Sequence, residues 1–214
     1  GPLTISCEPT LCLRLLIPAL GELKRDYGLD VRVLAAGGPI DFGRDHCDLA
    51  IRRSDFAIPS GVTTRVLARE WTGPVESPAL EPHSLDEIPL LLSDTRPDAW
   101  RDWMARAGVT FSGPLVRYEH FYLAVQAAEA GQGVALASVH MVAKELAEGR
   151  LRAPHRFIED GTEYVALYPS SRDDERIDIC VRWLTDIMAA NLASISAGAD
   201  QAQAGNSTGQ GAPE

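Results

Sequence analysis

Residues 3–20 read LTISCEPTLCLRLLIPAL, and they contain the first strand-to-helix unit that we expect in this chain. Its first part, Leu3 to Cys7, alternates apolar and polar side chains, which predicts a strand. Pro9 and Thr10 then favour the start of a helix, because proline suits the first helical turn and the threonine hydroxyl can accept a backbone N–H. The apolar positions continue at a period of about 3.6, at Leu16, Leu20, Leu23 and Tyr27, and Gly28 ends the helix.

Strand-like and helix-like segments continue to alternate after this stretch. The further strands that we expect are 31–34, 48–52, 62–67, 70–76, 90–92, 115–118, 134–137 and 164–168, and the further helices are 98–107, 121–130, 139–148 and a closing helix through Ile177, Val181, Leu184, Met188 and Ile195. Ser84 to Glu87 has the spacing of a capping box. This order is typical of βαβ units, so we predict an α/β fold with a mainly parallel sheet.

Two cycles of strands and helices predict two lobes. The first cycle ends near 70–76, and the chain returns late, near Glu163. We therefore expect lobe I over 3–75 and 164–195, lobe II over 76–163, two crossing strands between them and a cleft where they meet. Residues 196–214 contain no aromatic or large aliphatic side chain, so we expect a disordered tail there, and Gly1-Pro2 has the appearance of a cloning scar.

The charge balance limits the partners of this chain. It has 20 Lys and Arg against 30 Asp and Glu, a net charge of −10, which is the wrong sign for neutralising phosphates. We therefore expect no direct binding to nucleic acid. No apolar run reaches the roughly 20 residues that span a membrane. The first residues lack the basic and apolar blocks of a signal peptide, so we expect a cytoplasmic protein without membrane contact.

The sequence offers no motif for catalysis, for a cofactor or for a metal. Four cysteines, Cys7, Cys12, Cys47 and Cys180, are scattered without a C-x-x-C pair, which favours buried free thiols. His46 is next to Cys47, but neighbours on a strand edge point to opposite faces and cannot easily serve one nucleophile site, so we favour packing over catalysis for this pair. Gly131-Gln132-Gly133 lacks the third glycine of a dinucleotide fingerprint and indicates a turn. We expect a non-enzyme without cofactor or metal.

Two strand-to-helix turns are candidate walls of a binding site. Thr10 lies at a helix start beyond the first strand, where free N–H groups and the positive end of the helix dipole attract anions; the alternative is that Thr10 only caps the helix. The second turn carries Tyr118, Glu119, His120, Phe121 and Tyr122, which line a pocket or plug the seam between the lobes. Arg52 and Arg53 end the third strand, where a guanidinium suits a ligand carboxylate; a surface ion pair with Asp48 or Asp55 is the alternative.

Five quoted motifs give the chain a family resemblance over about Leu3 to Leu192. In order they are LTISCEPTLCLRLLIPAL at 3–20, CDLAIR at 47–52, SPAL followed by DEIPLLL at 77–92, AAEAGQGVALAS at 127–138 and GRL at 149–151. Together they resemble the effector-binding domain of LysR-type transcriptional regulators. DAWRDWMARAG at 98–108 is most similar to the branch of glycine-cleavage and β-lactamase regulators. The resemblance implies a two-lobed, periplasmic-binding-protein-like (type 2) fold, with two crossover strands and an effector in the interlobe cleft.

The resemblance also implies partners and site residues. It implies pairing through a strand and a helix of opposite lobes, hence a homodimer or tetramer, and an amino-terminal winged helix-turn-helix, absent from this chain, as the only DNA contact. The effector-binding residues that we expect are Pro9, Thr10, Leu11, Arg52, Arg53, Tyr118, Glu119, His120, Phe121 and Glu163. Two departures stand out: Glu119-His120-Phe121 replaces the small hydroxyl residues common in the family, and Arg53-Ser54 replaces an aromatic residue and glycine.

We therefore predict an effector-sensing and dimerisation domain in which a bound ligand changes the lobe angle. The acidic and aromatic residues near Tyr118 suit an amino group, whereas Thr10 and Arg52 suit a carboxylate, so an amino acid or another zwitterion satisfies both. The alternatives are a free-standing cytoplasmic solute-binding protein or an enzyme of the same fold, and a dimerisation module without a ligand.

Overall fold

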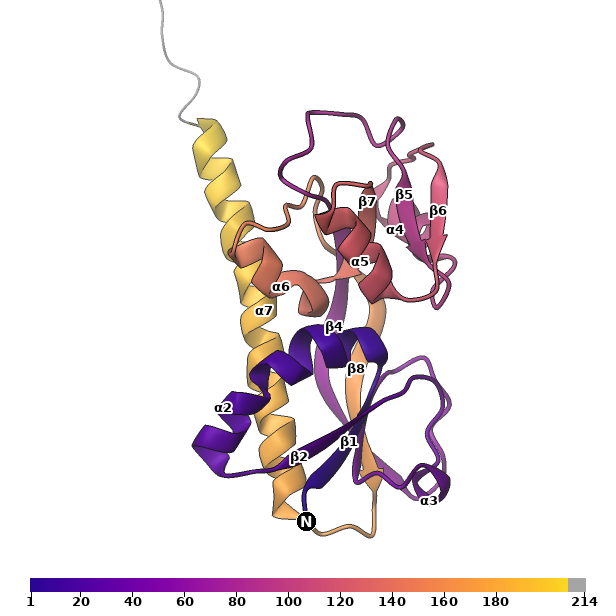
Figure 1. The fold of residues 1–214 in the computed structure, drawn as a ribbon, viewed down its shortest axis with the longest axis vertical. Coiled ribbons are helices and arrows are strands. Elements are labelled where there is room, and N and C mark those ends of the chain that lie inside the picture. Colours follow the sequence, from indigo (N-terminus) through magenta and orange to yellow (C-terminus); the bar gives the residue numbers. More distant parts are fainter. Residues whose placement is uncertain (208–214) are drawn as a thin grey trace, which may run out of the picture.

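The structure, a computed structural model, describes residues 1–207, with side chains described as far as residue 196 (Figure 1). Its elements in chain order are β1 (Leu3–Cys7), α1 (Pro9–Leu11), the π-helical turn η1 (Cys12–Leu16), α2 (Ile17–Tyr27), β2 (Val31–Ala35), α3 (Phe42–Asp45), β3 (Leu49–Arg53), β4 (Val62–Val75), β5 (Leu90–Ser93), α4 (Ala99–Ala107), β6 (Leu115–Tyr118), α5 (Phe121–Glu129), β7 (Val134–Ser138), α6 (Val139–Ala147), β8 (Ile158–Pro169) and α7 (Glu175–Ser207). The predicted alternation of strands and helices is confirmed.

The strands form one sheet in the order β2-β1-β3-β8-β4-β7-β5-β6. β1 pairs in parallel with β2 and β3, and β5 pairs in parallel with β6 and β7. Between these two parallel groups run β4 and β8, the two longest strands, which pair antiparallel with each other. We call β1–β3 with α1, η1, α2 and α3 lobe I, and β5–β7 with α4, α5 and α6 lobe II. The two crossing strands that the sequence predicts are therefore β4 and β8.

Each crossing strand is longer than expected. The segments 62–67 and 70–76, predicted as two strands, form the single strand β4. Its pairing with β8 shifts register between Val66 and Ala68 and again between Arg69 and Trp71. These shifts break the alternation that a regular strand shows, which explains why the sequence suggested two strands. β8 begins at Ile158 rather than at 164. The prediction missed its first half because the residues before Tyr164 are mostly polar and resemble a loop.

The first helix is built differently from the expectation. Glu8, rather than Thr10, is the N-cap: its carboxylate accepts the backbone N–H of Thr10 and of Leu11, both at 2.9 Å. The cap prediction for Thr10 was wrong, because a carboxylate two residues earlier already satisfies these donors. The π-helical turn η1 precedes Pro18, which has no N–H to donate to the helix.

Three further predictions concern the segment 84–87, the turn at Gly131 and the carboxyl-terminal tail. Ser84 to Glu87 forms a turn in which Ser84 Oγ accepts the Asp86 N–H, and no helix follows because β5 begins at Leu90. Gly131, at φ +76°, turns the chain after α5, as predicted. The expected tail, 196–214, falls partly within α7, which continues to Ser207; its last residues, 208–214, lie outside the described residues.

The core spans both lobes and the crossing strands. Trp100 and Trp103 of α4 are both 2% exposed and belong to a cluster under lobe II, which confirms them as core residues. The helix α7 contributes Ile177, Val181, Leu184 and Met188 to the largest cluster, and it contacts α2 of lobe I and α6 of lobe II (Figure 1). All four cysteines are free and buried, as predicted. Among the described residues, no helix combines the length and apolarity that a membrane crossing requires.

Candidate functional site

A cavity of about 770 Å³ lies between the two lobes. Lobe I contributes the end of β3 and the turn after it, lobe II contributes the loop after β5 and helix α4, and β4 and β8 form the floor. The lining residues are Arg53, Asp55, Thr72, Thr95, Arg96, Pro97, Asp98, Ala99, Asp102, Trp103, Ala105, Arg106, Phe121, Leu136, Ile158, Glu159, Asp160 and Thr162. A cavity of this size is within the range of small-molecule sites.

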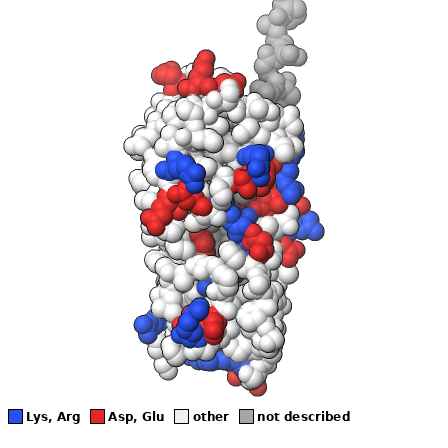
Figure 2. Space-filling view, turned by 90° about the vertical axis from the view of Figure 1, so that its right-hand side faces the viewer, with Lys and Arg blue, Asp and Glu red and all other residues white. Residues whose placement is uncertain are grey.

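Charged side chains from both lobes surround this cavity. Figure 2 shows acidic and basic groups next to one another around the middle of one face of the molecule. Across the mouth, Arg96 of lobe II forms a two-point ion pair with Asp55 of lobe I, in which Arg96 Nη2 lies 3.1 Å from Asp55 Oδ1. The hydrogen bond from Arg96 holds the pKa of Asp55 below its usual value. The guanidinium also lies 5.6 Å from the centre of the Phe56 ring.

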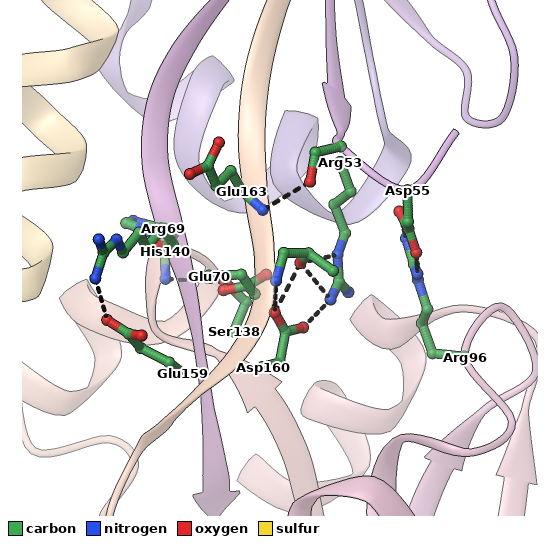
Figure 3. Close-up of polar contacts among 12 residues, drawn as sticks. Arg53, Asp55, Arg69, Glu70, Arg96, Ser138, His140, Glu159, Asp160 and Glu163 are labelled. Carbon is green, nitrogen blue, oxygen red and sulfur yellow. Dashed lines mark hydrogen bonds and ion pairs between the residues drawn. The ribbon is translucent and has the colours of Figure 1, made fainter. Parts of the chain in front are cut away.

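The floor of the cavity carries a second ion pair. Arg53, at the end of β3, contacts Asp160 and Thr162 of β8 (Figure 3). Asp160 in turn accepts the backbone N–H and the hydroxyl of Thr162, at 2.8 and 2.7 Å. Opposite charges and hydrogen bonds therefore fix the orientation of Arg53 at the point where lobe I meets β8.

Behind the floor, β4 and β8 enclose a buried polar cluster at the irregular stretch of their pairing (Figure 3). Glu70 is fully buried, and Ser138 Oγ donates to its Oε1 at 2.7 Å. Burial raises the pKa of Glu70 to about 7, and the nearby Arg53 only partly opposes this. Burial also lowers the pKa of His140 to about 4; its ring packs edge-on against Tyr164. Glu70 Oε2, His140 Nδ1 and Tyr164 Oη have no hydrogen-bond partner among the described residues.

The structure places the residues of the first predicted turn in the seam between the lobes. Thr10 is buried, and its Oγ1 accepts the backbone N–H of Tyr122 at 3.1 Å. Leu11 is buried in the main core, and Pro9 occupies the first helical turn. The two predicted turns therefore do meet across the lobes, but none of these three residues lines the cavity.

The two arginines at the end of β3 have separate places. Arg53 lines the cavity, as described. Arg52 is buried on the other side of the strand, where it donates to the carbonyl oxygens of Gly38, Ser6 and Ile51 and to the Ser6 hydroxyl. Arg52 does not form the surface ion pair that was the alternative for these arginines, because its hydrogen-bond partners within the described residues are neutral oxygens.

Among the residues of the second turn, Phe121 lines the cavity. Tyr118 donates from its hydroxyl to Gln132 Oε1 at 3.3 Å, and the ring of His120 stacks on Tyr122 with centres 5.3 Å apart. The Glu119 side chain is 81% exposed. Glu163 pairs with Arg69 in the β4–β8 ladder, outside the cavity lining. The structure therefore brings Arg53 and Phe121 together at the cavity and leaves the other predicted residues around it.

Sequence reasoning missed much of lobe II's contribution. Thr95, Arg96 and Asp98 follow β5 directly, and Arg106 lies near the end of α4. A usable signal was present, because polar residues beyond the carboxyl end of a strand are the usual binding positions in an open α/β sheet. The segment 158–162 carried no such signal, since its polar residues look like a loop. No group of acidic, histidine or cysteine side chains in the described part of the chain is arranged to hold a metal ion.

Two parallel strand groups, bridged by two long antiparallel strands and separated by a charged cavity, define a two-lobed small-molecule-binding domain of the periplasmic-binding-protein type. The comparisons with known proteins agree with this class. The model of the LysR substrate binding domain matches residues 1–189, and the chain belongs to this family.

Curated relatives and solved structures support the assignment. The chain is 32% identical to the HTH-type transcriptional regulator TrpI of Pseudomonas aeruginosa over 203 residues, which is 88% of this chain and 68% of the relative. It is 30% identical to the glycine cleavage system transcriptional activator of Escherichia coli over 205 residues, 89% of this chain and 66% of the relative. The AmpR effector binding domain of Citrobacter freundii superposes with a TM-score of 0.70 at 25% identity, covering 89% of this chain and 99% of that domain.

Proposed function

We propose that the chain senses a small-molecule effector in the interlobe cavity and passes its presence to a DNA-binding domain elsewhere in a LysR-type regulator. The observation that carries this proposal is the cavity itself, because its lining comes from both lobes and from both crossing strands. A ligand that contacts both lobes binds one lobe angle better than another, and this difference in affinity is what shifts the conformation. A coupling of about 1–3 kcal/mol is typical of such systems.

The proposal also covers the oligomeric state, the location and the DNA contact of the whole regulator. The chain acts as a homodimer or tetramer in the cytoplasm, contacts DNA only through an amino-terminal winged helix-turn-helix, and makes or breaks no covalent bond. Arg53 and Phe121 are the predicted effector residues that the proposal keeps as ligand contacts, since both line the cavity. The division into lobes at 75 and 164 stays a prediction. The effector class of amino acids and zwitterions also stays a prediction of this proposal.

A thermal-shift screen tests the proposal. The panel contains amino acids, quaternary amines, small carboxylates and peptidoglycan fragments, because a ligand at 100 times its Kd stabilises the folded state by about 2.7 kcal/mol. Ala105→Trp fills the cavity from α4 and should remove the shift, whereas Ala189→Trp, on the exposed side of α7, should keep it. No stabilisation by any compound, together with a stable dimer, would favour a dimerisation module instead.

A further inference from the structure

The number of charged side chains that line the interlobe cavity does not by itself indicate the charge of the ligand. The lining contains three arginines and five carboxylates, which on its own favours a cationic ligand. Each carboxylate, however, already has a guanidinium partner. The pairs are Asp55 with Arg96, Asp160 with Arg53, Glu159 with Arg69, and both Asp98 and Asp102 with Arg101. Arg69 and Arg101 lie outside the lining, and Asp98 and Asp102 share Arg101, so four guanidinium groups pair with the five carboxylates.

Arg106 is the arginine of the lining that takes part in none of these ion pairs. It lies in the last turn of α4, is exposed, and has no carboxylate partner among the described residues. Its Nη1 donates to the backbone oxygen of Glu159 at a long 3.4 Å. Its Nη2 lies against the β8 backbone at Gly161, 3.1 Å from where a Cβ would stand. The guanidinium is thus held at the cavity by a neutral backbone contact, which leaves its charge available.

A second guanidinium approaches the same part of β8 from the other lobe. Arg53 uses Nε and Nη2 on Asp160 and Thr162, while its Nη1 has no hydrogen-bond partner among the described residues. Arg106 and Arg53 therefore contact neighbouring residues of one four-residue segment, one from lobe II and one from lobe I. Beside them, Trp103, Phe121, Leu136 and Ile158 supply apolar side chains to the lining.

We infer that the effector carries an oxyanion, a carboxylate or a phosphate, on a compact apolar body, and that Arg106 and Arg53 Nη1 bind this group from opposite lobes. This inference rests on the proposed function of the cavity and narrows it to a ligand class. Planar guanidinium groups match oxyanions with two parallel hydrogen bonds, and the apolar side chains take the rest of the ligand. An anion bound by both lobes also favours the closed arrangement, because only there are both arginines within reach.

The experiment compares four probes of one shape by NMR titration and calorimetry. Benzoate and phenyl phosphate carry the oxyanion, benzamide is neutral, and benzylamine is cationic. We expect the better anion to bind about tenfold or more tightly than benzamide, since a hydrogen bond to a charged group is worth about 1.5–3 kcal/mol. The stronger of the two anions distinguishes a carboxylate effector from a phosphate effector. Arg106→Gln should remove the preference, and Arg106→Lys should restore part of it.

Arg156→Gln is the matched control, because Arg156 is exposed, lies outside the lining, has no carboxylate partner among the described residues, and donates to a backbone oxygen at the end of α4, that of Ala107, at 3.3 Å. Tighter binding of benzylamine or benzamide overturns the inference, as does an anion preference that survives Arg106→Gln or the absence of binding by both anions. A cationic hit in the effector screen that Ala105→Trp blocks would overturn this inference and keep the proposed function. Anion binding that requires Arg106 but leaves the lobe angle unchanged would keep this inference and overturn the proposed function.

Discussion

The two sides of the boundary between the lobes are built in opposite ways. On the side of α1 and η1, Arg14 reaches from lobe I to Glu129 of α5 and Glu145 of α6, at 2.9 and 3.3 Å. Close by, Thr10 accepts the Tyr122 N–H. These groups are largely buried, so the two lobes are joined here by contacts that are costly to break. We call this side the closed seam.

On the side of β3 and α4, the lobes leave the cavity between them. The contact across its mouth, Arg96 with Asp55, is partly exposed, and exposed ion pairs contribute little to stability. We infer from this difference that the two sides have separate tasks: the closed seam holds the lobes together, and the cavity side leaves their relative position adjustable. Substitutions on the closed seam should therefore change stability, whereas substitutions on the cavity side should change ligand response.

Arg14→Ala tests the closed seam and should have the largest effect. It leaves Glu129 and Glu145 beside the core without their main partner, and breaking a buried pair from one side costs about 3 kcal/mol or more. Urea unfolding monitored by fluorescence measures the loss. Arg25→Ala, at an exposed pair with Asp26 on α2, is the control and should change stability by less than about 1 kcal/mol. Equal losses in the two variants would refute the distinction.

Glu70 lies between the two sides, and its titration should shape the pH dependence of stability. Its pKa is about 7 in the fold against 4.5 for a free carboxyl, so the folded state binds the extra proton between these values. Stability therefore falls as pH rises from 4.5 to 7, by about 3 kcal/mol in all. Glu70→Gln removes this penalty and should be more stable than the wild type at pH 8, by about 2–3 kcal/mol, as measured by urea unfolding.

His140 should produce the opposite slope. Its pKa is about 4 in the fold against 6.5 when free, so the unfolded chain binds the extra proton between these values and stability rises with pH. In the wild type the two slopes oppose each other between 4.5 and 6.5. Glu70→Gln should expose the rise due to His140, and unfolding at pH 5 and pH 6.5 measures it. A Glu70→Gln variant that stays flat over this range would contradict the assigned titrations.

Thr10→Val should lower the free energy of unfolding by about 1–2 kcal/mol, because it keeps the shape of the side chain but leaves the partly buried N–H of Tyr122 without its acceptor. Thr10→Ser keeps the hydroxyl and is the control. Ligand binding separates the two sides further. Since Thr10 lies in the closed seam and not in the cavity lining, a ligand found in the screen should bind Thr10→Val with nearly unchanged affinity. A loss of binding beyond about tenfold would move Thr10 into the site.

The fold was largely predictable because its elements follow strong periodic signals. Strands with buried faces and helices such as 98–107 show their period within the sequence itself. The failures occurred where long-range pairing outweighs local pattern. β4 and the first half of β8 are strands because each pairs with the other, and their bulges and polar residues conceal this in the sequence.

The site was less predictable, because a cavity depends on which side chains converge. The rule that ligands lie beyond strand ends selected Arg53, and the structure places Arg53 in the cavity lining. The same rule selected Thr10, but Glu8 and Tyr122 change its role in ways that only the fold reveals. Arg106 could not be selected from the sequence. We propose it as a ligand contact because it has no carboxylate partner among the described residues, and this depends on the positions of all its neighbours in the fold.

Arg96→Gln tests the cavity side and should have the smallest effect on stability. Asp55 and Arg96 are partly exposed, so their double-mutant cycle with Asp55→Asn should give a coupling of about 0.5–1 kcal/mol that weakens as salt is added. The lobe angle should respond more, because this pair is the ionic contact across the cavity mouth. Spin labels on lobe I and lobe II measure the distance between lobes, and we expect a broader distribution in Arg96→Gln that narrows when ligand is added. A coupling as large as that of Arg14 with Glu129, or an unchanged distance distribution, would mean that both sides hold the lobes equally and that the closed seam is not special.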